Sequence, residues 1–137
     1  MKRSVLSSGG HITNIQIKTK PDCYTSEGEL IKRLANGALL CTACGHRCKL
    51  QPGQRGVCKV RFNEDNTLKV PFNYVSGTQN DPIEKKPFFH AIPGSRAFSF
   101  GMLGCDFHCA YCQNWFTSQS LRDSSATLSL TELDPED

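Results

Sequence analysis

Cysteines supply the most distinctive chemistry in this 137-residue sequence. The chain contains eight of them, and seven fall into two compact groups. Thiolates at such short spacing are typical ligands of zinc ions and iron–sulfur clusters. The residues after Met1 contain no apolar segment of the kind that a secretory signal requires, so we do not expect a framework of disulfides. The pattern predicts metal chemistry in a reducing compartment, with the isolated Cys23 as a free thiol.

The second cysteine group has the spacing Cys-x3-Cys-x2-Cys and consists of Cys105, Cys109 and Cys112. Three thiolates from one loop can bind three irons of a [4Fe–4S] cluster, whereas a cluster usually has four cysteine ligands. The fourth iron is then free to bind another molecule, as the open position of a catalytic zinc site does. The spacing therefore favours a cluster that takes part in chemistry over one that only stores an electron.

The first cysteine group consists of Cys41, Cys44, Cys48 and Cys58. Four thiolates can close a tetrahedral Zn²⁺ site or bind a second, auxiliary [4Fe–4S] cluster. The spacing Cys-x2-Cys-x3-Cys-x9-Cys matches neither template, and both metals remain open. His46 lies inside the group as a spare ligand. Either centre is expected to organise the N-terminal half, because metal binding and folding are coupled in small domains.

The residues around the second group extend the pattern. They are Phe98-Ser99-Phe100-Gly101 and Gly104 before Cys105, Phe107 and Tyr111 within the group, Gln113-Asn114-Trp115 after Cys112, and upstream Asp81-Pro82-Ile83-Glu84-Lys85-Lys86-Pro87 and His90-x-x-Pro93-Gly94-Ser95. With these flanks the sequence resembles the radical S-adenosylmethionine (SAM) superfamily. The similarity is to the branch of pyruvate formate-lyase activating enzyme, and particularly to the radical SAM member of the AmmeMemoRadiSam system. It covers about residues 41–119.

The resemblance implies that Cys105, Cys109 and Cys112 bind a [4Fe–4S] cluster and that SAM chelates its open iron. The reduced cluster would then cleave SAM to a 5′-deoxyadenosyl radical, which abstracts hydrogen from an unknown substrate. Tyr111 occupies the position that lies against the adenine. The implied partners are an electron donor of the flavodoxin or ferredoxin type and Memo-family proteins. Asp106 departs from the family, which has Asn there, and an acid beside an anionic cluster disfavours reduction.

Two other functions remain open. One is activation of a glycyl radical enzyme by hydrogen abstraction from a backbone glycine. The other is a non-catalytic module with two metal sites, used for electron transfer or for zinc-dependent binding. No side chain is assigned a catalytic role, because the residues give no indication of the substrate.

Local patterns predict short elements. Ser26-x-x-Glu29 has the form of a capping box, and the apolar residues after it predict a helix over 27–36. The other expected elements are a hairpin with strands 57–62 and 67–70, an extended connector over 73–94, a strand over 96–101, a helix beginning within 113–119, and the start of an amphipathic helix in the tail 121–137.

The expected fold class is α/β. We expect the first βα unit of a partial (βα)6 radical SAM barrel, truncated, preceded by a small metal-binding region with a β-hairpin. The expected divisions are a flexible tail over 1–25, the four-cysteine region and connector over 26–95, and the start of the radical SAM core over 96–137. Because a closed barrel needs on the order of 200 residues, the chain is expected to be a fragment that is inactive alone.

Charge and hydropathy exclude two classes of partner. The formal net charge is +3, and the basic residues are spread along the chain, whereas nucleic-acid binding requires a clustered basic face. No apolar run approaches the roughly 18 residues of a membrane span. We therefore expect neither nucleic-acid nor membrane binding and a cytoplasmic location. The alternative is an organellar transit peptide, because the segment before Asp22 is basic and free of acidic residues.

Overall fold

The computed structural model describes residues 21–126 and 128–133. In these residues the chain forms four small antiparallel sheets, three 3₁₀ turns and one short α-helix. The strands are β1 (Thr25–Glu27), β2 (Ile31–Arg33), β3 (Leu39–Cys41), β4 (Lys49–Leu50), β5 (Phe62–Glu64), β6 (Thr67–Pro71), β7 (Tyr74–Val75), β8 (Gly77–Pro82), β9 (Arg96–Gly101) and β10 (Thr131–Glu132). The helix is α1 (Trp115–Gln119), and the 3₁₀ turns are η1 (Pro21–Cys23), η2 (Ala35–Gly37) and η3 (Ile83–Lys85).

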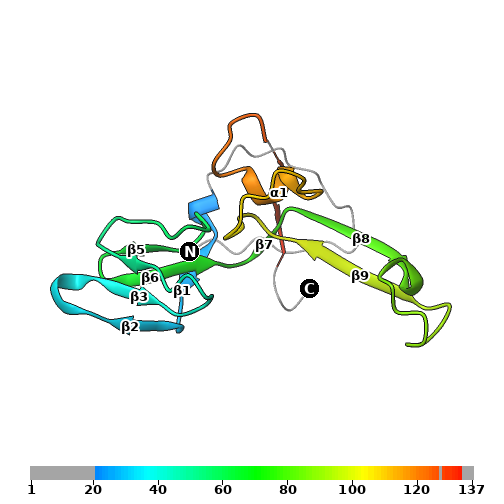
Figure 1. Ribbon diagram of the computed structural model, residues 1–137, viewed down its shortest axis with the longest axis horizontal. Coiled ribbons are helices and arrows are strands. Elements are labelled where there is room, and N and C mark those ends of the chain that lie inside the picture. Colours follow the sequence, from blue (N-terminus) through cyan, green and yellow to red (C-terminus); the bar gives the residue numbers. More distant parts are fainter. Residues whose placement is uncertain (1–20, 127, 134–137) are drawn as a thin grey trace, which may run out of the picture.

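Two three-stranded sheets form the N-terminal part, with strand orders β2-β3-β4 and β1-β6-β5 (Figure 1). The predicted hairpin is confirmed in its second strand and turn, because β5 and β6 pair as neighbours. Asp65 and Asn66 form the turn with φ of 48° and 65°, a conformation that Asn and Asp tolerate better than most residues. The first strand begins later than expected, at Phe62, and residues 57–61 instead turn around Cys58.

A small apolar core lies between these two sheets. It consists of Leu39, Cys41, Leu50 and Leu68, each at most 6% exposed. Asn63 is also fully buried, and its Nδ2 donates hydrogen bonds to the carbonyl oxygens of Gly37 (2.9 Å) and Leu50 (3.0 Å). A buried amide with two partners fixes the relative position of the chain segments that it joins. One of the predicted metal ligands, Cys41, is thus a core residue.

The predicted helix over 27–36 is wrong, because this segment forms β1, β2 and η2. The Gly28 N–H donates to the carbonyl oxygen of Leu68 (2.8 Å), and Ile31 pairs with Cys41 of β3. A ten-residue helix is marginal in isolation, and here the backbone instead gains hydrogen bonds from two neighbouring sheets. Leu30, which the helix would have placed on its apolar face, is 57% exposed.

The predicted (βα) barrel is also wrong. The strand expected over 96–101 is present as β9, but it pairs antiparallel with β8, from Gly77 opposite Gly101 to Pro82 opposite Arg96. The first strand of a barrel would need a parallel partner reached through a helix. Here the chain returns through η3 and a loop, and the result is a two-stranded ribbon that extends away from the N-terminal sheets (Figure 1). The molecule is β-rich.

The ribbon also corrects the expected connector over 73–94, which contains β7, β8 and η3. β8 and β9 lie on opposite sides of the expected division at residue 95. Side chains of β9 alternate between exposed and partly buried, and Phe98 and Phe100 are 63% and 60% exposed. Backbone pairing with β8 therefore positions the end of β9, just before the second cysteine group.

The C-terminal part contains the expected short helix and a strand that was not expected. α1 confirms a helix beginning within 113–119. In the tail the described residues form turns and then β10, which pairs with β7, so the amphipathic helix is wrong where the structure describes this segment. Residues 127 and 134–137 lie outside the described residues, as do residues 1–20 of the expected tail. In the part of the chain that the structure describes, no helix is both long and apolar enough to cross a bilayer.

Candidate metal centre

The first cysteine group lies on the β3–β4 hairpin and on the loop that follows it. Cys41 ends β3, and its N–H donates to the carbonyl oxygen of Cys48 (2.9 Å). Between them the Arg47 N–H donates to the carbonyl oxygen of Cys44 (3.2 Å), which closes a tight turn. This turn brings three thiols to the same end of the hairpin.

Cys58 reaches the other three through a turn at Gly56. The Gly56 N–H donates to the carbonyl oxygen of Arg61 (2.8 Å), and the Lys59 N–H donates to that of Gly56 (3.0 Å). A Cβ atom at Gly56 would lie 3.6 Å from the Sγ of Cys48 and 3.7 Å from that of Cys58. The two sulfurs therefore flank the same buried glycine.

A cavity of about 330 Å³ opens beside this turn. All four cysteines of the first group line it, together with Cys105 and Asp106 of the second loop. All these cysteines are free thiols. The structure thus brings the first group together, and adds one thiol of the second group to the same cavity.

The four thiols are spread more widely than the ligands of a single zinc ion. In a zinc–thiolate tetrahedron the sulfurs lie about 3.8 Å apart. Within the described residues, one group of three or more His, Cys, Asp or Glu donors has all its ligand atoms within 4.8 Å, and it consists of Cys44, His46 and Asp106. The four-thiol set therefore fits a zinc ion or a cluster by its chemistry, but it is not contracted around a single ion.

The second cysteine group forms a loop between β9 and α1. Gly104 precedes it with φ +86°, and a Cβ atom there would lie 2.6 Å from the carbonyl oxygen of Cys58. The two cysteine groups are therefore packed backbone against backbone at this glycine. The Cys112 N–H donates to the carbonyl oxygen of Cys109 (3.2 Å), which makes the end of the loop a tight turn.

Two of the three thiols in this loop have polar neighbours that can stabilise a thiolate. The Phe107 N–H donates to the Sγ of Cys105 (3.4 Å), and the Ser118 hydroxyl lies 3.4 Å from the Sγ of Cys112. Hydrogen bonds to sulfur are among the features that set the reduction potential of iron–sulfur clusters. Against this, the Oδ1 of Asp106 lies 3.9 Å from the Sγ of Cys105. The carboxyl group of Asp106 therefore lies beside Cys105, a predicted cluster ligand, where its negative charge would disfavour reduction of the cluster.

Cys109 and Tyr111 face solvent. Cys109 is exposed, and Tyr111 is 88% exposed. Neither they nor Cys112 line the cavity of the first group. The loop therefore offers its cysteines in two directions, with Cys105 toward the cavity and Cys109 toward solvent.

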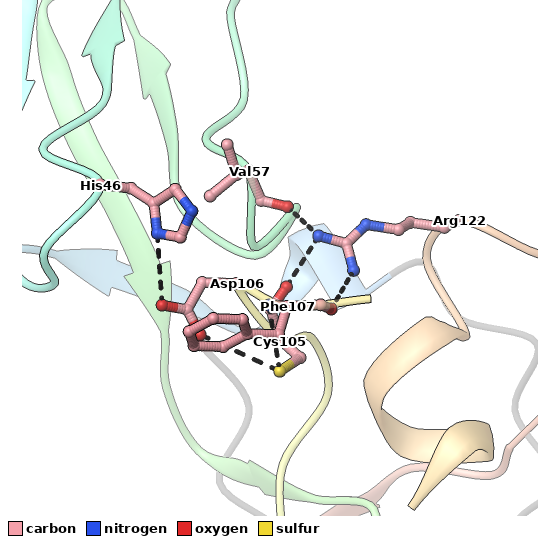
Figure 2. Close-up of polar contacts among 6 residues, drawn as sticks. All are labelled: His46, Val57, Cys105, Asp106, Phe107 and Arg122. Atoms are coloured by element: carbon pink, nitrogen blue, oxygen red, sulfur yellow. Dashed lines mark hydrogen bonds and ion pairs between the residues drawn. The ribbon is translucent and has the colours of Figure 1, made fainter. Parts of the chain in front are cut away.

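Arg122 is a structural residue of this loop that the sequence did not reveal. Its guanidinium donates to the carbonyl oxygens of Cys105 (2.8 Å), Phe107 (3.0 Å) and Val57 (Figure 2). The fully buried Gln119 donates a further hydrogen bond to the carbonyl oxygen of Phe107 (3.3 Å). Arg122 thus ties the second cysteine loop to the residue before Cys58. No sequence motif signals an arginine whose contacts are mostly to backbone carbonyls.

His46 and Asp106 form the other bridge between the two loops. The Nδ1 of His46 lies 3.4 Å from the Oδ2 of Asp106 (Figure 2). The imidazole also packs edge-on against the ring of Phe107, with 6.0 Å between ring centroids. His46, which the sequence presented as a spare ligand, is therefore oriented toward the second loop.

The charged run over residues 81–86 lies at the outer end of the ribbon, where β8 and β9 are joined, and is apart from these cysteines (Figure 1). Asp81 accepts hydrogen bonds from Lys85 and Lys86, both at 2.9 Å, and these ammonium groups lower the pKa of its carboxyl. The Gly94 N–H donates to Glu84 (2.7 Å) and lowers the pKa of that carboxyl. These pairs close the turn between β8 and β9. The geometry assigns them a local structural role.

Comparison with known proteins yields one relative. An uncharacterized protein of Methanocaldococcus jannaschii is 37% identical over 94 residues, which cover 68% of this chain. The match covers 28% of the relative's own length. No family model matches the chain, and no solved structure matches it significantly.

Proposed function

We propose that this chain carries a radical SAM-type iron–sulfur site, with Cys105, Cys109 and Cys112 as the ligands of a [4Fe–4S] cluster and SAM at its open iron. The observation that carries the proposal is the loop itself. Its Cys-x3-Cys-x2-Cys thiols are free, and two of the three have hydrogen-bonding neighbours at sulfur. When bound, such a cluster supplies the electron that cleaves SAM and yields a carbon radical for hydrogen abstraction.

The residues of the chain have distinct tasks in this proposal. Phe107 and Ser118 stabilise the thiolates of Cys105 and Cys112 through hydrogen bonds. Arg122 holds the carbonyls of the loop, so that the ligands keep their spacing. Tyr111, which is 88% exposed, offers an uncovered ring on which an adenine can stack, because aromatic side chains stack readily on bases.

The exposure of Cys109 supports a protein electron donor of the flavodoxin or ferredoxin type. A cluster with one ligand at the surface has an edge that a partner can approach directly. Memo-family proteins remain proposed partners through the sequence resemblance. The substrate from which the radical would abstract hydrogen is outside the proposal.

A non-catalytic module with two metal sites is the second candidate. The observation that favours it is the shared cavity, in which Cys105 lies with all four cysteines of the first group. Two centres joined in this way suit electron transfer between clusters or metal-dependent binding of a partner. The two candidates differ in whether SAM reaches the iron.

The test is anaerobic reconstitution followed by iron and sulfide analysis and EPR spectroscopy. We expect Cys109→Ala to lose about four irons and four sulfides per chain, and Cys23→Ala, at the isolated cysteine, to lose none. Added SAM should change the EPR signal of the reduced wild-type cluster. An unchanged iron content in Cys109→Ala would refute the cluster assignment. A cluster whose EPR signal is indifferent to SAM would support the second candidate.

A further inference from the structure

The Cys44, His46 and Asp106 side chains carry an inference that does not depend on the proposed cluster. Their ligand atoms are a sulfur, an imidazole nitrogen and a carboxylate oxygen, all within 4.8 Å of one another. They come from the turn of the first cysteine group and from the second cysteine loop. We propose that these three residues bind one Zn²⁺ ion, with the fourth position of the tetrahedron open.

The donor set matches the coordination chemistry of zinc. Zn²⁺ accepts thiolate, imidazole and carboxylate ligands, and three protein ligands with an open fourth position are typical of its reactive sites. Soft sulfur and imidazole donors disfavour Mg²⁺ and Ca²⁺, which prefer oxygen. The His46 side chain is 40% exposed and that of Asp106 28% exposed, so solvent can supply the fourth ligand.

The distance between His46 and Asp106 also fits a shared ion. A charge-assisted hydrogen bond between them would be about 2.7–2.9 Å long, and the observed separation is 3.4 Å. With zinc–nitrogen and zinc–oxygen bonds near 2.1 Å, two ligands of a tetrahedron lie about 3.4 Å apart. The ring of Phe107 packs edge-on against the His46 imidazole, and the Nδ1 of that imidazole is directed toward Asp106. The Sγ of Cys44 lies within 4.8 Å of both ligand atoms, whereas a sulfur and a nitrogen on one tetrahedral zinc lie about 3.6 Å apart.

The charges favour the ion as well. A thiolate at Cys44, a carboxylate at Asp106 and a neutral His46 together balance the charge of Zn²⁺. The ion would therefore neutralise Asp106, whose other oxygen lies 3.9 Å from the Sγ of Cys105. This gives a physical reason for an acid at a position where it would otherwise repel an anionic ligand.

The proposed site uses Cys44 in a different way from a four-cysteine site. One thiol cannot serve both arrangements with a single ion. Cys41 is 6% exposed and packs with Leu39, Leu50 and Leu68, and a buried cysteine often behaves as a small apolar residue. The number of thiolates on the metal, one or four, separates the two arrangements.

The test combines metal affinity with cobalt spectroscopy. Zn²⁺ binding would be measured by chelator competition, and Co²⁺ would be substituted to read the intensity of the thiolate-to-cobalt charge-transfer band. Both would be done on the full chain and on the Cys109→Ser/Cys112→Ser chain, whose second loop cannot bind metal through those thiols. The double variant separates failure of this inference from failure of the cluster proposal.

We expect Asp106→Asn and His46→Gln each to weaken Zn²⁺ binding at least tenfold relative to the parent, which is the chain into which each substitution is introduced. In that parent the intensity of the cobalt charge-transfer band should correspond to one thiolate ligand. The matched controls, Asp65→Asn at the β5–β6 turn and His108→Gln in the same loop, should bind as the parent does. Circular dichroism would establish that the variants fold. Wild-type affinity in both ligand variants, with a four-thiolate band, would assign the metal to the four-cysteine set. If the folded parent bound neither zinc nor cobalt, His46 and Asp106 would form a direct polar contact and not a metal site. Either result would overturn the inference.

Discussion

Arg122 provides a direct test of how the second cysteine loop is held. Its guanidinium donates to three carbonyl oxygens, those of Val57, Cys105 and Phe107, and to the Oε1 of Gln119 (3.1 Å). Arg122→Met keeps most of the length and the apolar part of the side chain while removing every donor. The variant therefore isolates the contribution of these hydrogen bonds.

The magnitude follows from the number and setting of the contacts. A hydrogen bond to a charged group contributes about 1.5–3 kcal/mol to stability. Arg122 is only partly buried, so solvent compensates for part of the loss, and the freed side chain regains up to about 2 kcal/mol of conformational entropy. We expect Arg122→Met to lower the free energy of unfolding by about 2–3 kcal/mol. Arg122→Lys should recover part of this, because an ammonium can reach one or two of the carbonyls.

Urea denaturation followed by circular dichroism would measure the change, and iron retention after reconstitution would report on the loop. Arg96→Met is the matched control, since Arg96 is exposed and, among the described residues, its side chain donates hydrogen bonds only to Asn80. We expect this control to change stability by less than about 0.5 kcal/mol. Equal stability of Arg122→Met and wild type would show that the three carbonyls are satisfied by water and that the arginine does not position the loop.

Two further predictions concern other parts of the chain. Gly104→Ala places a Cβ atom 2.6 Å from the carbonyl oxygen of Cys58 at a φ of +86°, and should lower the free energy of unfolding, measured in urea, by about 3 kcal/mol. The control Gly45→Ala, whose Cβ position is open, should leave that free energy almost unchanged. Equal stabilities of the two variants would contradict the close packing at Gly104. The lysines that lower the pKa of Asp81 stabilise its charged form, so their contribution should be present above the unfolded pKa of about 3.9 and lost as the pH falls through the lower folded value. The stability difference between wild type and Asp81→Asn should therefore shrink in acid, and a difference that grows would contradict the assignment.

Local chemistry made part of the fold predictable. Residue types within a short segment were enough to predict three elements, which are the Asp65-Asn66 turn, the strand at 96–101 and the helix near 115. The segment 27–36 could not be assigned in this way. Its apolar residues satisfy a helical pattern, but Gly28 and Ile31 gain backbone partners from strands far along the chain. Long-range pairing of this kind overrides local propensity.

The candidate site shows the same limit. The spacing of the cysteines identified both groups, because metal ligands are confined to a few residue types at short intervals. The spacing did not indicate that Cys105 and Asp106 reach the cavity of the first group, nor that His46 faces Asp106. These contacts join segments about 60 residues apart, and they follow from the packing of Gly104 against Cys58. The barrel expected from the resemblance failed because it required a parallel partner for β9, and the described residues supply an antiparallel one.

The packing at Gly104 has a consequence for how such a protein can change over evolutionary time. Because the glycine lies directly on the backbone of Cys58 and on the side chain of Val60, neither segment can drift in sequence without the other. A larger residue at 104 would need a compensating change at 58–60, in the other cysteine loop. Among descendants of this chain we expect the two loops to be inherited as one unit, with substitutions at 60 and 104 appearing together and loss of one cysteine group followed by decay of the other.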